Sequence, residues 1–180
     1  MGVPILRSER LILEPLSLSH LTEEYVNWLN DPEVNSYLDS GGDYTFKKLK
    51  DFLKDVEKKN ILFWAIHLNH NHKHIGNIKI DPVNFKHGLC EYGILLGDKN
   101  EWRKGFAKEA SLMVIDYCFN SLNLRKMTLG VVEDNENAVT LYKKLGFIIE
   151  GVYIDHRYHN NQYWNTLRMA LFNKMYNSKR

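Results

Sequence analysis

A short basic segment with a single glycine, Trp102-Arg103-Lys104-Gly105, stands between two apolar stretches of the chain. The run Ile94-Leu95-Leu96 before it is typical of a buried strand, and the pattern that begins at Phe106 is typical of an amphipathic helix. The first N–H groups of a helix have no partner within it, and the helix dipole attracts anions to that end. The glycine lets a ligand approach the backbone, and Lys108 adds to the positive charge. The segment therefore predicts a binding site for a phosphate or a diphosphate.

A second motif lies between residues 135 and 147. Asn135 is followed by Ala138 and then by Tyr142, and the stretch ends in the pair Gly146-Phe147. On a helix, the spacing of Ala138 and Tyr142 places both side chains on one face. The motif resembles one found in the GNAT superfamily of N-acetyltransferases, in which Asn and Ala precede a Tyr and a Gly-Phe pair.

The basic segment resembles the acyl-CoA loop of the same superfamily. Gly105 and Ala107 match the last two anchors of the family pattern, while Trp102 stands where Arg or Gln is usual and Arg103 where a first glycine is usual. The Trp variant resembles a subgroup that includes ribosomal-protein N-terminal acetyltransferases and spermidine acetyltransferases. The resemblance implies acetyl-CoA as cosubstrate, a primary amine as acceptor, direct attack in a ternary complex, and no metal.

The resemblance covers residues 8–172 and implies a single GNAT acyl-CoA N-acyltransferase domain of the α/β (α+β) class, with residues 173–180 as a C-terminal tail. It implies a central mixed, mostly antiparallel sheet of about six or seven strands, flanked by helices. Two strands, at residues 94–96 and 126–132, would splay and leave backbone groups free to pair with the pantetheine arm. An N–H near Leu95 could act as an oxyanion donor. The expected cosubstrate-binding residues are Ile94, Leu95, Leu96, Trp102, Arg103, Lys104, Gly105, Phe106, Ala107, Lys108, Asn135, Ala138, Tyr142 and Lys144.

The expected reaction needs a general base. A lysine-like amine has a pKa of about 10.4, so deprotonating it at pH 7 costs roughly 4–5 kcal/mol. Glu91 is the first candidate, because strand alternation puts it on the same face as Gly93 and Leu95. A surface carboxylate is the alternative interpretation. Glu133 and Asp134, at the end of the next expected strand, are rival candidates.

The reaction also needs a general acid, and Tyr142 resembles the one of the family. Proton transfer from a phenol with a pKa of about 10 to a thiolate with a pKa of about 8.5 is uphill by roughly 2 kcal/mol, unless the site lowers the phenol's pKa. The alternative is a packed core aromatic with a bonded hydroxyl. Asn135 is expected to contact the CoA arm, to cap its helix, or to do both.

The rest of the chain reads as elements that position these residues. Ser19 is expected to cap the first helix, and Thr45 a later one with Phe46 on its apolar face. The histidines at positions 67, 70, 72 and 74 straddle an expected turn and are interpreted as a solvated loop without a metal. A flexible loop is expected over residues 39–43. Strands are expected over residues 10–15, 61–68, 75–80 continued by 83–86, 91–96, 126–132, 147–158 and 163–172, and helices over 19–29, 33–37, 45–59, 135–145 and from 106.

The composition is that of an ordinary globular domain, with 180 residues, 44% hydrophobic residues and 26% charged residues. The net charge of +2 is too small to indicate nucleic acid or a membrane as partner. Cys90 and Cys118 lie in apolar segments, which favours free thiols and a reducing compartment. The N-terminus lacks a long apolar run, so we expect a cytoplasmic protein. A homodimer is left open.

The acceptor is less defined by the sequence. The stretch from Trp28 to Pro32, with Tyr37, resembles one in sugar-nucleotide acetyltransferases, whose early helices wall the acceptor pocket. His156 and His159 would either bind an anionic or sugar acceptor or decorate a hairpin. We rank a small amine, either an amino sugar nucleotide or a polyamine, above a protein N-terminus. A non-catalytic acyl-CoA-binding module is the alternative, and nucleic-acid binding has only a dilute basic helix to support it.

Overall fold

The computed structural model describes residues 2–38, 42–59, 61–159 and 161–179. Residues 39–41, which belong to an expected loop, lie outside them. The chain divides into two compact units, the first formed by Met1–Asp81 with Gly93–Met113 and the second by Pro82–Tyr92 with Val114–Arg180. The single domain expected over residues 8–172 stays a prediction.

The strands form one mixed sheet in the order β1-β2-β3-β4-β5-β6-β8-β7. The pairing of β5 with β6 is parallel, whereas the pairs β1–β2, β2–β3, β3–β4, β6–β8 and β7–β8 are antiparallel. The expected mixed, mostly antiparallel sheet is confirmed. Among the described residues it has eight strands rather than six or seven, because the two-residue β1 was not predicted. The strands are β1 Leu6–Arg7, β2 Leu11–Pro15, β3 Leu62–Leu68, β4 His74–Asn84, β5 Leu89–Leu96, β6 Lys126–Val132, β7 Ile148–His159 and β8 Gln162–Phe172.

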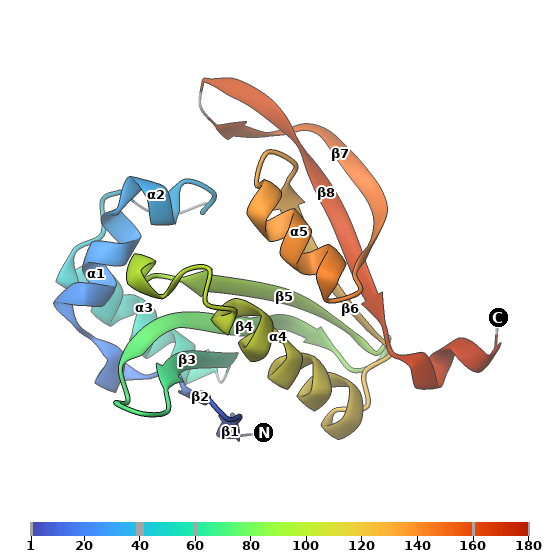
Figure 1. Ribbon diagram of the computed structural model, residues 1–180, viewed down its shortest axis with the longest axis horizontal. Coiled ribbons are helices and arrows are strands. Elements are labelled where there is room, and N and C mark those ends of the chain that lie inside the picture. The colour runs from blue at the N-terminus through green and yellow to red at the C-terminus, as the bar shows by residue number, and fades with distance from the viewer. Residues whose placement is uncertain (1, 39–41, 60, 160, 180) are drawn as a thin grey trace. The chain divides into compact units, whose positions relative to one another are not determined.

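The helical segments follow the expected order along the chain (Figure 1). They are η1 Leu18–His20, α1 Glu23–Asn30, α2 Pro32–Asn35, α3 Phe46–Lys59, η2 Lys99–Glu101, α4 Phe106–Asp116, the π-helical turn η3 Tyr117–Ser121, α5 Glu136–Lys144 and η4 Lys174–Lys179. In the part of the chain that the structure describes, no helix is both long and apolar enough to span a bilayer. The cytoplasmic location stays a prediction.

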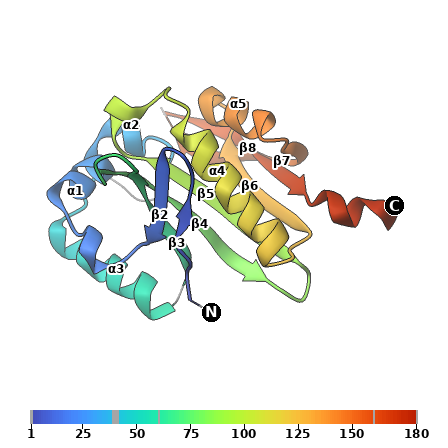
Figure 2. The ribbon, with the colours of Figure 1, turned by 60° about the horizontal axis from the view of Figure 1, so that its bottom comes forward.

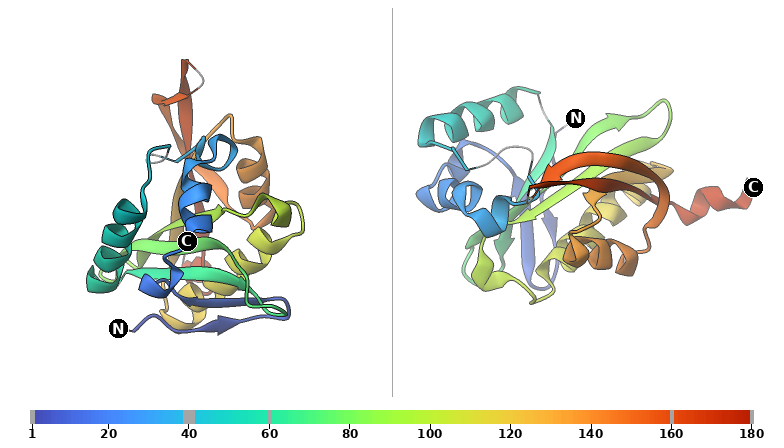
Figure 3. Two further views of the ribbon diagram at one scale, coloured as in Figure 1. Left: turned by 90° about the vertical axis from the view of Figure 1, so that its left-hand side faces the viewer. Right: turned by 90° about the horizontal axis from the view of Figure 1, so that it is seen from above.

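The core of the first unit lies between α1, α3 and β3. Leu49 and Leu53 of α3 pack with Ala65 of β3, and all three side chains are fully buried. Figures 2 and 3 show α1 and α3 together on one side of β2 and β3. Leu95 of β5 packs against the same cluster. The apolar face predicted for α3 is confirmed, except that Phe46 at its start is 48% exposed.

The beginning of the first helix differs from the prediction. Ser17, rather than Ser19, caps η1, and its hydroxyl accepts from the Ser19 N–H. Leu21 is extended, so that α1 starts only after Thr22, whose hydroxyl accepts from the Tyr25 N–H at 3.2 Å. Two capping residues therefore divide a segment that a single periodic pattern had joined.

Two glycines permit close packing around the end of β5 in the first unit. A Cβ at Gly76 would collide with the Leu95 carbonyl oxygen, and a Cβ at Gly97 would collide with the indole of Trp28. The Gly97 N–H donates to the Ile75 carbonyl at 3.0 Å. The turn after β5 is therefore held between β4 and the indole.

The prediction that β4 breaks at Asp81-Pro82 is wrong, because β4 continues to Asn84. The register of β4 with β3 ends at the pair Ile80–Leu62, so Pro82 removes no donor from that ladder.

The second unit is built around β6 and the hairpin of β7 and β8. β6 occupies the predicted range, pairing with β5 over Leu89–Glu91 and antiparallel with β8 along its whole length. Met127, Leu129 and Met169 are almost fully buried between the elements of this unit. α5 lies beside β7 and β8 in Figures 1 and 2. The splay expected between β5 and β6 stays a prediction.

Candidate functional site

The basic segment forms a loop whose backbone is set by two positive φ angles. Arg103 has φ +62° and Gly105 has φ +86°. The indole N–H of Trp102 donates to the Leu96 carbonyl at 2.9 Å and so ties the loop to the end of β5. The tryptophan therefore has a structural role at the position where the family pattern has Arg or Gln.

The loop presents its charges outward at the start of α4. Arg103, Lys104 and Lys108 are exposed, whereas Phe106 is only 8% exposed and packs inward. Lys104 pairs with Glu101 at 2.9 Å. Within the described residues, Arg103 and Lys108 form no ion pair. The arrangement fits the predicted anion site, in which helix N–H groups and nearby cations face one ligand.

Arg10 braces this loop from β1–β2, a contact that the sequence did not reveal. Its Nη1 donates to the Lys104 carbonyl at 3.1 Å, and its Nε donates to Glu109 at 2.7 Å. Ser8 donates to the other oxygen of Glu109 at 2.7 Å. Burial acts to raise the pKa of Glu109, but the hydrogen bonds from Ser8 and Arg10 outweigh it and lower the pKa. The guanidinium lies 4.7 Å above the ring of Phe106.

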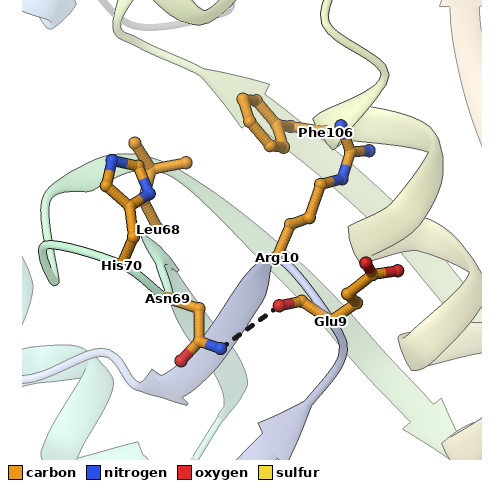
Figure 4. A pocket seen from close by; sticks show the side chains of 6 residues that line it. All are labelled: Glu9, Arg10, Leu68, Asn69, His70 and Phe106. Carbon is orange, nitrogen blue, oxygen red and sulfur yellow. Dashed lines mark hydrogen bonds between the residues drawn. The ribbon is translucent and has the colours of Figure 1, made fainter.

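Figure 4 shows the cavity of about 210 Å³ beside this brace, with Arg10 directed toward Phe106. The cavity is shallow and its Asn69 amide donates to the Glu9 carbonyl at 3.2 Å. It lies next to the loop and contains none of the predicted catalytic residues. Its lining is formed by Glu9, Arg10, Leu68, Asn69, His70 and Phe106.

Replacing Gly105 with alanine is expected to weaken CoA binding about tenfold, because a left-handed backbone costs a residue with a Cβ roughly 1–2 kcal/mol. Isothermal titration calorimetry with CoA measures the effect. Gly151→Ala is the matched control, because no atom lies within 4 Å of its added Cβ. Equal affinities for the two variants would contradict a role of the loop conformation in binding.

Tyr142 is a buried aromatic of the second unit. It is 8% exposed and contacts Tyr92 edge-on at 5.9 Å and Phe147 at 5.9 Å. Among the described residues, its hydroxyl has no hydrogen-bond partner. The ring is therefore packed as a core aromatic would be. Within the described part of the chain, however, the hydroxyl lacks the hydrogen bond that the alternative interpretation expects. Burial raises the pKa of Tyr142 to about 12.

The pKa of Tyr142 is raised, whereas a lowered pKa would make proton donation to the thiolate easier. A proton moving from a group with a pKa of about 12 to a free thiolate with a pKa of about 8.5 climbs roughly 5 kcal/mol. Tyr142 can therefore act as an acid only if proton transfer is coupled to breakage of the C–S bond and to formation of the stable amide.

Asn135 is the N-cap of α5, as predicted. Its side-chain oxygen accepts from the Ala138 N–H at 3.2 Å. Gly146, with φ +94°, follows the end of the helix, and Lys144 is exposed in its last turn. The contacts of Asn135, Ala138 and Lys144 with CoA stay predictions.

Glu91 lies in a network of hydrogen bonds. Arg168 of β8 donates to both of its carboxylate oxygens at 2.8 Å, and Thr128 of β6 donates to one of them at 2.9 Å. The ion pair raises the pKa of the Arg168 guanidinium above its ordinary value. The rivals Glu133 and Asp134 follow β6, with Glu133 exposed. Glu91 thus links three neighbouring strands of the second unit.

Gly130 makes the Glu91–Arg168 pair sterically feasible. It lies opposite Arg168 in the register of β6 and β8, and a Cβ added there would stand 2.8 Å from Arg168 Nη1. A glycine within a strand often marks the close approach of another group. Gly130 is therefore a local sequence feature that points to the Glu91–Arg168 pair.

We expect Gly130→Ala to displace the Arg168 guanidinium and to lower the free energy of unfolding by about 1–2 kcal/mol, because charged hydrogen bonds are lost at a partly exposed site. Urea denaturation measures the change. Gly151→Ala, a change in β7 with open space around the added Cβ, should have a much smaller effect. Equal losses in both variants would argue against the steric explanation.

The predicted residues divide between the two units. The segment from Ile94 to Lys108 belongs to the first unit, and Glu91, Asn135, Ala138, Tyr142 and Lys144 belong to the second. His156 is exposed in β7, with its ring 5.0 Å from that of Tyr153, and the side chain of His159 lies outside the described ones. Sequence reasoning missed Arg10, Thr128 and Arg168, which hold the predicted residues in place.

Comparisons with known proteins find relatives among the N-acetyltransferases. The uncharacterized N-acetyltransferase p20 of Bacillus licheniformis is 30% identical over 155 residues, which are 84% of this chain and 86% of that protein. Spermidine N(1)-acetyltransferase of Escherichia coli (strain K12) is 36% identical over 101 residues, or 56% of this chain. The chain spans about half the length of that relative, 54%.

Solved structures extend the likeness over most of the chain. The crystal structure of spermidine N-acetyltransferase from Vibrio cholerae in complex with CoA and spermine has a TM-score of 0.83 at 26% identity, covering 92% of this chain and 97% of that one. The family model described as Acetyltransferase (GNAT) domain matches residues 10–148. The chain belongs to the GNAT acetyltransferase family.

Proposed function

We propose that the chain is an acetyl-CoA-dependent N-acetyltransferase that transfers acetyl from the CoA thioester to a primary amine. The family match over residues 10–148 is the observation that carries this proposal. The loop before α4 supports it, because a left-handed Arg103 and Gly105, exposed cations and a helix N-terminus suit a diphosphate. The fourteen residues expected to bind the cosubstrate remain part of the proposal.

In the proposed reaction, the amine nitrogen attacks the thioester carbonyl carbon within a ternary complex. A C–N bond forms, the C–S bond breaks, and the leaving thiolate takes a proton from the Tyr142 hydroxyl. The new ammonium group loses its proton to water or to a base, and the phenolate recovers a proton from solvent. An N–H near Leu95 would stabilise the oxyanion that forms on the carbonyl.

We propose a polyamine as the preferred acceptor. Spermidine acetyltransferases are among the relatives, and one of the similar structures contains spermine. Carboxylates suit a substrate with several ammonium groups, and α1 and α2 carry Glu23, Glu24 and Glu33. Lys99 partly neutralises Asp31 at 2.6 Å and Glu33 at 3.4 Å, which leaves Glu23 and Glu24 as the carboxylates of this set that Lys99 does not pair with. An amino sugar nucleotide and a protein N-terminus are the alternative acceptors.

An assay of thiol release with acetyl-CoA and a panel of amines tests both the acetyl-transfer activity and the identity of the acceptor. The panel contains spermidine, a uridine-diphosphate amino sugar, free amino acids and peptides with a free N-terminus. We expect release with spermidine at a kcat/KM at least tenfold above that for the other amines. A higher kcat/KM for another amine would overturn the polyamine acceptor but leave the N-acetyltransferase activity in place. CoA binding without release for any amine would favour a non-catalytic acyl-CoA-binding module.

The role of Glu91 as general base stays part of the proposal, although a carboxylate held by a guanidinium is a weak base. If Glu91 is the base, Glu91→Gln should lower kcat about 100-fold and remove the acid limb from the pH profile of kcat/KM. If it only positions Arg168, the limb should persist while the free energy of unfolding falls. The pH profile therefore separates the two roles, and the profile of Glu133→Gln tests the rival base in the same way.

A further inference from the structure

Three histidines from three different elements meet inside the first unit. His20 comes from η1, His67 from the end of β3 and His74 from the start of β4. Their ring centroids lie 5.2 Å apart in all three pairs, and His20 and His67 are each only 6% exposed. Tyr25 and Trp28 of α1 close the cluster through edge contacts with His74. The interpretation of His67 and His74 as parts of a solvated loop is therefore wrong.

Two ring nitrogens of this cluster face each other at the spacing of metal ligands. Nε2 of His20 lies 3.1 Å from Nε2 of His67. In a tetrahedral Zn²⁺ site with Zn–N bonds of about 2.0–2.1 Å, neighbouring nitrogens lie roughly 3.3 Å apart. A carboxylate oxygen of Glu14 completes the group, with all three donor atoms within 4.8 Å of one another.

The hydrogen bonds of His67 prepare its Nε2 as a ligand. Its Nδ1 lies 2.9 Å from the His72 carbonyl oxygen, which can only accept, so Nδ1 carries the proton. A neutral ring then has its lone pair on Nε2. Metal-binding histidines commonly donate their other N–H to a backbone carbonyl in this way.

His20 can adopt the same tautomer. Its Nδ1 has three acceptors at 3.3 Å, which are the Ser17 carbonyl, the Ser17 hydroxyl and the Ser19 hydroxyl. Nδ1 also lies 3.1 Å from the Ser17 N–H, so a ring with its proton on Nε2 is accommodated as well. Without an ion, that second tautomer lets His20 donate to His67. With an ion, the proton moves to Nδ1 and both Nε2 lone pairs face the metal.

Glu14 brings the negative charge that a divalent ion requires. It lies two residues from Ile12, which pairs with His67 in the register of β2 and β3, so Glu14 and His67 share one face of the sheet. Nε2 of the half-exposed His72 lies 3.5 Å from a Glu14 oxygen and could supply a fourth ligand. Two histidines and a carboxylate are a common zinc ligand set.

We propose that Glu14, His20 and His67 bind a divalent transition-metal ion, best matched by Zn²⁺, which links β2, η1 and β3. The ion replaces its water ligands with one carboxylate oxygen and two imidazole nitrogens, and no electron is transferred. This site is separate from the predicted acetyl-transfer residues and does not depend on the proposed acceptor. The proposal differs from the expectation, stated from the sequence and the family resemblance, that the protein binds no metal.

Metal titration of the full chain after removal of metals with a chelator tests the proposal. We expect one Zn²⁺ per chain by calorimetry, a dissociation constant in the micromolar range, and a higher melting temperature with the ion. Co²⁺ should give the intense visible absorption of a four-coordinate site. Absence of a calorimetric signal, or a weak octahedral Co²⁺ spectrum, would show a purely hydrogen-bonded histidine cluster and overturn the proposal.

Variants distinguish the site from adventitious surface binding. His67→Gln should abolish binding, but it alters a buried position. The Glu14 side chain is 28% exposed, so Glu14→Gln should preserve the fold. It should weaken Zn²⁺ binding about 100-fold. His70→Gln, in the exposed turn after β3, is the matched control and should bind like the parent chain. Equal Zn²⁺ affinities for Glu14→Gln and His70→Gln would overturn the assignment.

Discussion

Tyr142→Phe is expected to lower kcat about 100-fold and to leave CoA affinity within a factor of two, because a positioned acid contributes at least that much to the rate. The change removes only the hydroxyl, and the ring contacts with Tyr92 and Phe147 are retained. Because burial holds the pKa of Tyr142 at about 12, the parent enzyme should show no loss of kcat from ionisation of this group up to about pH 10.

Steady-state rates of thiol release and CoA calorimetry measure these two quantities on the same samples. Tyr163→Phe is the matched control, because it removes a phenol hydroxyl from a side chain that is 66% exposed. If Tyr142→Phe turns over as fast as Tyr163→Phe, the acid role is excluded. A large loss of CoA affinity in Tyr142→Phe would instead assign the hydroxyl to cosubstrate binding.

The second large effect concerns acid stability. Burial, together with the neighbouring His20, lowers the pKa of His74 from 6.5 to about 3. A histidine whose pKa is depressed in the folded state stabilises the fold above its unfolded pKa, and this stability is lost as pH falls toward the folded pKa. At about 1.4 kcal/mol per pKa unit, the free energy of unfolding should drop by roughly 5 kcal/mol between pH 6.5 and pH 3.

Urea denaturation at a series of pH values, with EDTA present, measures this slope. Groups that face His74 from neighbouring elements include His20, His67, Tyr25 and Trp28, and the pKa values of both of these histidines are also lowered by burial. His74→Gln removes one titrating group and should flatten the slope, whereas His70→Gln should not. An unchanged slope in His74→Gln would refute the assignment.

Most secondary structure was predictable because its signals lie within a few residues of each element. α5 is the clearest case, since Asn135 caps its start and Gly146 follows its end with a positive φ. β6 occupies the predicted range because its apolar residues Met127, Leu129 and Val131 recur at every second position, as in a strand with one buried face. The first helix was predicted wrongly because Ser17 and Thr22 each cap a separate helix, within a stretch that a single apolar pattern had joined.

The missing parts of the candidate site depend on contacts between distant residues. Arg168 reaches Glu91 across 77 positions, and Arg10 reaches Glu109 across 99. No spacing rule indicates such pairs, because the sheet register that creates them is itself a product of folding. The histidine cluster was missed for the same reason, since His20 joins His67 from another element.

The contact between Trp28 and Gly97 has a consequence for engineering. The indole occupies the space in which a side chain at position 97 would have to lie, so position 97 can take a side chain only if the residue at position 28 becomes smaller. Libraries that diversify position 28 alone, in search of new acceptor preferences, will also disturb the turn that leads from β5 toward the basic loop. A smaller aromatic at 28 combined with alanine at 97 offers a compensated starting point.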